Sequence, residues 1–296
     1  MAAYTTIDNP ELYFQVKLWE GEASSQGDGT TTALTFDGDE DMQPDMIWIK
    51  DRDASSWHDL TDSVRGVTKS IYPSQNDPED TVATAVTTIG SDGFTVGSND
   101  QVNNGGNSFV AWCWKESATS GFDIVTYTGN GSNRTISHSL SAEPHWMLIK
   151  SRSDNYNWVS YQKTSGNNNV LALNITGAHD SGVGGSYFNS TNPTSSVFSL
   201  GTAANMNGSS KTFVAYLFAP KQGFSKFGKY TGNGNADGAF VYTGFRPAWV
   251  IVKSTASGAG WNIHDAKRDT YNEMNKQLYA NSNAADGSSR PIDFLS

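Results

Sequence analysis

The chain has 296 residues, of which 36% are hydrophobic, so it is long enough for two or three domains that each bury a core. Its formal net charge is −10, and such an acidic surface repels phosphate backbones, which argues against a nucleic-acid partner. The single cysteine, Cys113, excludes an intramolecular disulfide and lies in the apolar run FVAWCWK, where a core residue is expected.

The first ten residues, MAAYTTIDNP, lack the basic start and apolar stretch of a secretion signal. They are too few for a domain and are predicted to form an amino-terminal arm. No later run is long enough to cross a membrane, so we expect no membrane insertion and a protein that stays in the cytosol where it is made. Aromatic residues interspersed with Asn, Ser, Thr and Gly are typical of short strands joined by polar turns.

A strand that begins at a proline occurs three times along the chain, as PDMIWIKDR, PHWMLIKSR and PAWVIVKST, starting at Pro44, Pro144 and Pro247. A lysine stands six residues after each proline, at Lys50, Lys150 and Lys253. A tryptophan lies four residues after the first proline and two after the others, at Trp48, Trp146 and Trp249. Because strand side chains alternate with period two, both offsets place the indole on the face of the lysine.

Further segments repeat in the same order. The run YTGNG occurs at 127–131 and 230–234, GFTVG at 93–97 resembles VFSLG at 197–201, and FVAWCWK at 109–115 resembles FVAYLFA at 213–219. A second tryptophan opens the strand after each proline strand, at Trp57, Trp158 and Trp261. We therefore expect an all-β protein of tandem antiparallel β-sandwich repeats, jelly-roll or lectin-like, of about 100 residues each. The predicted segments are the arm 1–10, repeat one 11–120, repeat two 121–224 and an incomplete repeat three 225–296.

The strands MIWIK and FVAYLF are apolar on both faces, whereas an antiparallel strand with one buried face alternates apolar with polar. They are predicted to lie centrally, with the second face covered by a long loop, a sister domain or another subunit. In repeat three, adding 104 to Phe198 and Phe213 gives positions 302 and 317, beyond the 296 residues. Its last two strands are therefore absent, and either the natural chain continues or a neighbour supplies them.

Candidate chemistry is sparse. The five histidines lie in no metal-ligand spacing and are expected to be isolated surface residues, and the glutamates fall in turns, so neither a cofactor nor an enzyme is predicted. A weak metal candidate is the turn DGDEDM with Asp37, Asp39 and Asp41, for which a solvated turn is the alternative. The spacings Asp62–Arg65 and Asp265–Arg268 predict local ion pairs that order the chain after a strand, worth about 0–1 kcal/mol each when exposed, and substrate binding is the alternative.

Aromatic residues near strand ends could stack on sugar rings, as in lectin-like sandwiches. The candidates for glycan binding are Tyr156, Trp158, Tyr161, Trp57 and Trp261. The alternative is that the tryptophans complete the cores. Tyr156, flanked by Asp154 and Asn157, is the residue we most expect to be exposed.

The repeated pattern YTGNG, PxWxxxKSR, W, FSLG, FVAYLFA resembles a repeated domain of unknown function in predicted structural proteins of tailed, often marine, bacteriophages. It is similar in outline to concanavalin- and laminin-G-like sandwiches. The resemblance covers nearly the whole chain and implies no catalytic residues. It implies a virion protein assembled in the host cytoplasm, most simply a tail fibre or similar appendage for host adsorption. Other virion proteins, further copies in a homo-oligomer (a trimer first) and a host-surface glycan are the expected partners, and a capsid decoration protein, a glycan-binding module and a polysaccharide depolymerase are the alternatives.

Overall fold

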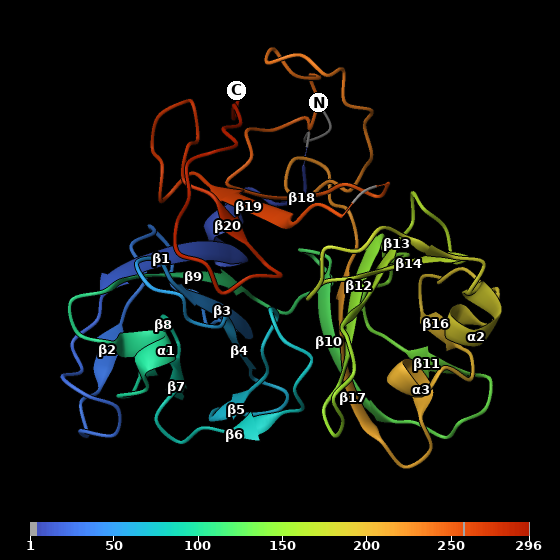
Figure 1. Ribbon diagram of the computed structural model, residues 1–296, viewed down its shortest axis with the longest axis horizontal. Helices are drawn as coiled ribbons and strands as arrows, with labels where there is room; N and C mark the ends of the chain where they lie inside the picture. Colours follow the sequence, from blue (N-terminus) through green and yellow to red (C-terminus); the bar gives the residue numbers. More distant parts are fainter. Residues whose placement is uncertain (1–4, 257, 296) are drawn as a thin grey trace.

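The computed structural model describes residues 5–256 and 258–295, and its regular structure is mostly antiparallel β-sheet (Figure 1). The prediction of an all-β protein is confirmed. We keep the terms repeat one, two and three for residues 11–120, 121–224 and 225–295. In Figure 1 they form blue-to-green, green-to-orange and orange-to-red groups of strands that meet at the centre of the molecule.

Repeat one has a main sheet and two smaller sheets. The main sheet contains, in spatial order, β1 (Phe14–Glu20), β9 (Ser108–Trp114), β3 (Met46–Asp51) and β4 (Asp59–Asp62). The smaller sheets contain β2 (Thr32–Leu34), β8 (Gly93–Val96) and β7 (Val86–Gly90), and β5 (Lys69–Ser70) with β6 (Asp80–Thr81). Single helical turns are η1 (Pro10–Leu12), before β1, and α1 (Asp100–Asn103), between β8 and β9.

Repeat two places its strands in the same order. Its main sheet contains β10 (Phe122–Thr128), β17 (Thr212–Phe218), β12 (Trp146–Ser151), β13 (Val159–Gln162), β14 (Asn169–Ala172) and β15 (Asp180–Ser181). The second sheet contains β11 (Arg134–Ser137) and β16 (Val197–Leu200), and the helices are α2 (Gly184–Phe188) and α3 (Ala204–Asn207). Both repeats are therefore sandwich-like, with a small sheet over one face of the main sheet.

Repeat three contains fewer strands within the described residues. They form one sheet of β18 (Trp249–Lys253), β19 (Trp261–Asp265) and β20 (Leu278–Tyr279). By pairing and order these strands correspond to β12, β13 and β14 of repeat two, and to β3, β4 and β5 of repeat one.

The main sheets are buried on both faces. On one face of β3, Ile47 and Ile49 pack in a core local to repeat one, and Met147 and Ile149 of β12 do the same in repeat two. On the other face, Trp48 joins a central core to which all three repeats contribute. β3 and β17 are interior strands, as predicted, and so are β9 and β12, and a sister repeat covers the second face of all four.

The central core is the main source of cohesion between the repeats. Its buried members include Trp48, Trp112, Leu148, Tyr216 and Ile263, from five different strands. Burying each such side chain contributes about 1.5–3 kcal/mol. Since all three repeats contribute residues to this one core, separating any repeat would expose apolar surface of the other two.

Cys113 is fully buried in the local core of repeat one, as predicted. Burial raises the pKa of its thiol well above the usual value, which keeps the thiol protonated and unreactive. Of the predicted arm, residues 1–4 lie outside the described part of the chain. Ile7 is buried, and the Asn9 side chain accepts a hydrogen bond of 3.0 Å from the backbone N–H of Glu11 at η1.

Candidate functional site

The structure places the five aromatic candidates for glycan binding in two environments. Trp158, Tyr161 and Trp261 are buried, so they complete cores and present no ring face to solvent. Trp57 is 38% exposed and packs edge-to-face on Tyr72, with ring centroids 5.6 Å apart. Tyr156 is partly exposed. Only Trp57 and Tyr156 of the five can therefore offer surface to a sugar.

Trp57 is not the counterpart of Trp158 and Trp261. In the three hairpins Met46 pairs with Asp62, Trp146 with Gln162 and Trp249 with Asp265. Counting back four residues from the second member of each pair gives His58, Trp158 and Trp261. The sequence alignment of the second tryptophans was wrong in repeat one by one residue. His58, predicted to lie at the surface, is fully buried.

These three equivalent rings connect the repeats in a cycle. His58 Nε2 of repeat one lies 3.0 Å from the Tyr279 carbonyl oxygen of repeat three. Trp158 Nε1 of repeat two donates to the Tyr72 carbonyl of repeat one, and Trp261 Nε1 of repeat three donates to the Ala172 carbonyl of repeat two, both at 3.0 Å. The acceptors directly follow equivalent strand positions, so the arrangement has approximate threefold symmetry.

His58 is held as a neutral imidazole. Trp48 Nε1 donates to Nδ1 at 2.9 Å, so the ring proton resides on Nε2, which faces two carbonyl oxygens. Burial, and then the nearby positive charge of Lys50, lower the pKa of His58 to about 3. A second proton would have to enter where the indole N–H already points.

We therefore expect acid to destabilise the protein through His58. Its pKa is near 6.5 when unfolded and about 3 when folded. The unfolded state thus binds the extra proton first, and stability falls as pH drops below about 6.5, by about 1.4 kcal/mol per pH unit for one such group. Urea unfolding at pH 7, 6, 5 and 4 should show a shallower loss for His58→Gln than for the parent. Parallel losses would contradict this role, and His264, whose pKa burial lowers to about 4, contributes equally to both proteins.

Two of the three junctions carry a buried ion network, where exposed local pairs were predicted. Between repeats one and two, Arg65 Nε lies 2.5 Å from Asp62 Oδ2, and both side chains are fully buried. Tyr216 Oη donates to the same Asp62 oxygen at 2.6 Å. Glu79 bridges Arg65 at 3.1 Å and Arg152 at 2.8 Å. The predicted local pairs are present, but they are buried rather than exposed, because the i, i+3 spacing carries no information about burial.

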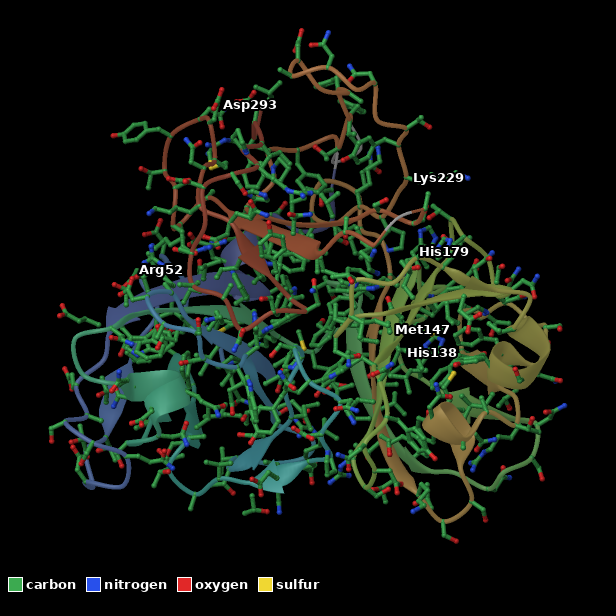
Figure 2. The ribbon with its side chains drawn as sticks, in the orientation of Figure 1. Arg52, His138, Met147, His179, Lys229 and Asp293 are labelled. Carbon is green, nitrogen blue, oxygen red and sulfur yellow. The ribbon has the colours of Figure 1, made fainter. Side chains whose placement is uncertain are left out.

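The junction between repeats three and one repeats this arrangement. Asp265 receives Arg268 Nε at 2.5 Å and Trp112 Nε1 at 2.9 Å, and Asp286 takes the place of Glu79. Arg52 Nε lies 2.9 Å from Asp286. Figure 2 labels Arg52, which lies where repeat one meets repeat three.

The junction between repeats two and three differs. Gln162 and Ser165 stand where the other repeats have Asp and Arg, and His179 stands in place of Glu79 (Figure 2). The backbone contact is kept, since His179 N donates to the Thr255 carbonyl at 3.1 Å. The side-chain ion network is therefore replaced by neutral groups at one junction of three.

The repeated lysines close the turns that follow their strands. Lys150 Nζ donates to the carbonyls of Ser151 at 2.7 Å and Asp154 at 3.2 Å, and Lys50 makes the matching bonds to Asp51 and Ala54. Burial lowers the pKa of each of these two lysines to about 8. Both side chains are fully enclosed, so their ammonium groups serve the backbone.

The acidic turn is engaged with neighbouring residues. Asp37 Oδ1 pairs with Lys17 at 2.6 Å and Oδ2 lies 3.5 Å from Lys267, and the Lys17 bond lowers the pKa of Asp37. The Asp39 backbone N–H donates to Glu11. Within residues 5–256 and 258–295 no cluster of three or more His, Cys, Asp or Glu side chains could hold a metal ion, and this includes Asp37, Asp39 and Asp41.

One carboxyl pair lies between repeats one and two. Burial, and then a hydrogen bond with Asp123, raise the pKa of Glu116 to about 7. Asp123 Oδ2 accepts from Ser139 N at 2.5 Å, and Glu116 Oε1 accepts from Ile124 N at 3.3 Å. Both acids thus fix the connecting loops. Sequence reasoning missed this pair because the two residues lie on either side of a turn that the strand pattern does not predict.

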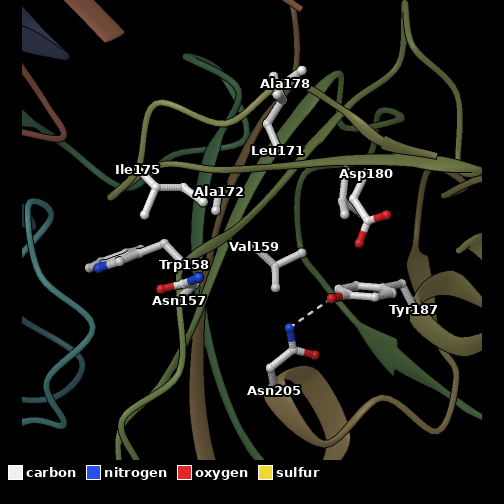
Figure 3. Close-up of a pocket in the computed structure, with 11 residues that line it drawn as sticks. Asn157, Trp158, Val159, Leu171, Ala172, Ile175, Ala178, Asp180, Tyr187 and Asn205 are labelled. Carbon is white, nitrogen blue, oxygen red and sulfur yellow. Dashed lines mark hydrogen bonds between the residues drawn. The ribbon is translucent and has the colours of Figure 1, made fainter. Parts of the chain in front are cut away.

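A partly enclosed pocket lies in repeat two, between β13, β14 and the helices α2 and α3 (Figure 3). Its volume is about 150 Å³, enough for a few water molecules or one small group. Polar groups enter from Asn157, Asp180, Tyr187 and Asn205, and Asn205 Nδ2 donates to Tyr187 Oη at 3.0 Å. The Trp158 ring itself lies in the central core.

The fold and these contacts define an all-β protein whose polar side chains mainly join its segments to one another. Residues 9–296 match the model of a family described as a domain of unknown function, DUF7483, and the chain belongs to that family. No curated protein and no solved structure matches the chain. In the described part of the chain, no helix is long and apolar enough to cross a membrane.

Proposed function

We propose that this protein is a non-enzymatic structural component of a tailed-bacteriophage particle, most simply a tail fibre or similar appendage involved in host adsorption. One observation carries the proposal: the buried ionisable side chains, which could otherwise serve catalysis, make the contacts that join the repeats. His58, Asp62, Arg65, Asp265 and Arg268 are buried, and each contacts a group of another repeat or a partner that does so. This arrangement suits a rigid scaffold.

The proposed architecture consists of three related β-sandwiches behind a short amino-terminal arm. The three repeats are tandem copies of one jelly-roll or lectin-like sandwich, preceded by an arm that contacts the particle. The equivalent strand orders of repeats one and two, and the cyclic ring contacts, support this description. Other virion proteins and further copies of the chain, a trimer first, are the partners, and the virion assembled in the host cytoplasm is the location.

Purified particles of a phage that encodes this protein test the proposal. Mass spectrometry should detect the protein as a stoichiometric component, and gold-labelled antibody should mark one part of the particle. Label on the tail supports the appendage, whereas label on the head supports a capsid decoration protein. Absence of the protein from washed, infectious particles would overturn the proposal.

Glycan binding is the second candidate, favoured by the exposed faces of Trp57 and Tyr156 and by the polar pocket beside Asn157. We expect Tyr156→Ala and Trp57→Ala to lose binding on a glycan array if these rings stack on sugars, with buried Trp158 left intact. Binding that survives both substitutions removes this site. A depolymerase would need an acid pair such as Glu116 and Asp123, and new reducing ends from host polysaccharide would reveal it.

A further inference from the structure

β18 of repeat three has an open edge. It pairs with β19 on one side, and no strand of residues 5–256 and 258–295 pairs with the other. The equivalent side of β3 is occupied by β9, and that of β12 by β17. β3 and β12 are buried at every position, whereas every residue of β18 is partly exposed.

Aromatic and aliphatic side chains of repeat three are left partly or largely uncovered. Tyr127 of repeat two is buried and stacks on Phe213 of β17, with centroids 5.2 Å apart and planes at 15°. Its counterpart in the second YTGNG run, Tyr230, is 55% exposed. Val250 and Val252 correspond to buried Met147 and Ile149 and are partly exposed. Phe240 and Tyr242, in the stretch before β18, are exposed as well.

The first glycine of each YTGNG run also indicates that a segment is missing beside repeat three. A Cβ on Gly129 would lie 2.3 Å from the Gly208 carbonyl oxygen, because the turn between α3 and β17 approaches closely there. Glycine is therefore required at 129. At the equivalent Gly232, a Cβ would meet no atom of the described chain within 4 Å. The sequence keeps a close-approach glycine where the described structure has nothing approaching it.

A buried acceptor at the junction between repeats two and three also lacks its partner. Asp62 accepts from Tyr216 Oη of β17, and Asp265 accepts from Trp112 Nε1 of β9. Tyr216 and Trp112 lie on equivalent strands, β17 and β9, and the described residues of repeat three contain no counterpart of these strands. Gln162 occupies the third equivalent position, and its Oε1 is buried with no hydrogen-bond partner among the described residues. Such an atom normally has a partner.

We propose that repeat three is completed by two further antiparallel strands with the residue pattern of β16 and β17, carried by a segment of this chain that follows residue 296. The second of these strands fills the open edge of β18, stacks an aromatic ring on Tyr230 and covers Val250 and Val252. The first pairs with the stretch around Phe240 and Tyr242, as β16 pairs with β11. We assign the strands to the same chain because β9 and β17 both follow their partner hairpins within one chain.

A graft tests whether the edge accepts such a segment. A copy of residues 193–220, which spans β16, α3 and β17, is added after residue 296 of the full chain. Amide hydrogen exchange in Trp249–Val252 should slow by about tenfold or more relative to the parent. The matched control carries Val214→Pro in the copied strand, which removes a central-strand donor and should restore parental exchange. A second graft with Tyr216→Phe in the copy should exchange faster than the unmodified graft and more slowly than the parent, because the donor to Gln162 is lost.

Three results would overturn the proposal. Equal exchange in graft and control means that the edge takes no such strand. Concentration-dependent protection of β18 in the 296-residue chain, together with a dimer in sedimentation, means that a second copy is the occupant. Intact mass of the protein isolated from its natural source gives an independent reading that needs no variant to fold. We expect a mass above 32.0 kDa, and a value of 32.0 kDa excludes a continuing chain.

Discussion

Replacing Asp62 by alanine is expected to lower the free energy of unfolding by about 3–5 kcal/mol, because the guanidinium of Arg65 then stays buried with its main charge partner removed. The Asp62 carboxylate accepts from Arg65 Nε at 2.5 Å, from the Arg65 backbone N–H at 2.7 Å and from Tyr216 Oη at 2.6 Å. All three donors lose this acceptor together. Equilibrium unfolding in urea, followed by tryptophan fluorescence, measures the loss.

Repeat two offers a matched control at the same strand position. Gln162 pairs across from Trp146 as Asp62 pairs across from Met46, but residue 165 is serine rather than arginine. Gln162→Ala should therefore cost no more than about 1 kcal/mol, since it uncovers no charge. If the two substitutions cost the same, the ion network at this junction contributes nothing beyond side-chain packing.

The second large effect is expected at the centre of the molecule. Trp112→Ala should cost about 3–5 kcal/mol, as for other buried aromatic residues cut to alanine. Its ring lies edge-to-face on Trp48 with centroids 5.8 Å apart, and the Arg268 guanidinium carbon is 5.6 Å from the ring centroid. Its Nε1 donates to Asp265, so the substitution also removes a contact between repeats one and three.

Because Trp112 belongs to a core shared by three repeats, the loss should appear as one shifted transition. Differential scanning calorimetry should give a van't Hoff enthalpy close to the calorimetric enthalpy in both proteins. Trp57→Ala, at an exposed indole, serves as the control and should change stability by no more than about 0.5 kcal/mol. A separate early transition for repeat one alone would show that the central core does not couple the repeats.

The repeated strands could be predicted from sequence because their signals are local. A proline, a period-two apolar run and a lysine at fixed spacing place β3, β12 and β18 correctly, and the apolar character of both faces predicts the interior positions of β3 and β17. Counting from the prolines, which are 100 residues apart in the first two repeats, also shows that His58 and Trp158 occupy equivalent positions. Matching tryptophan with tryptophan hid that relation in repeat one.

The contacts between repeats could not be predicted in the same way. Which carbonyl receives the Trp158 indole depends on how two sheets pack, and no spacing within one repeat encodes it. The same holds for Asp62, whose partner Tyr216 is 154 residues away. Among the glycan candidates, Trp158, Tyr161 and Trp261 cannot be told from exposed aromatic residues by their sequence surroundings. Only the tertiary packing shows that these three are buried.

One covalent chain that presents three similar interfaces can change each of them separately. In a ring of three identical subunits, any substitution would appear at all three contacts at once. Carboxylate–guanidinium pairs join two of the junctions, while among the described residues the junction around Gln162, Ser165 and His179 has no such pair. That junction should separate first under mechanical load, so the molecule has a preferred direction of opening that a symmetric ring could not have.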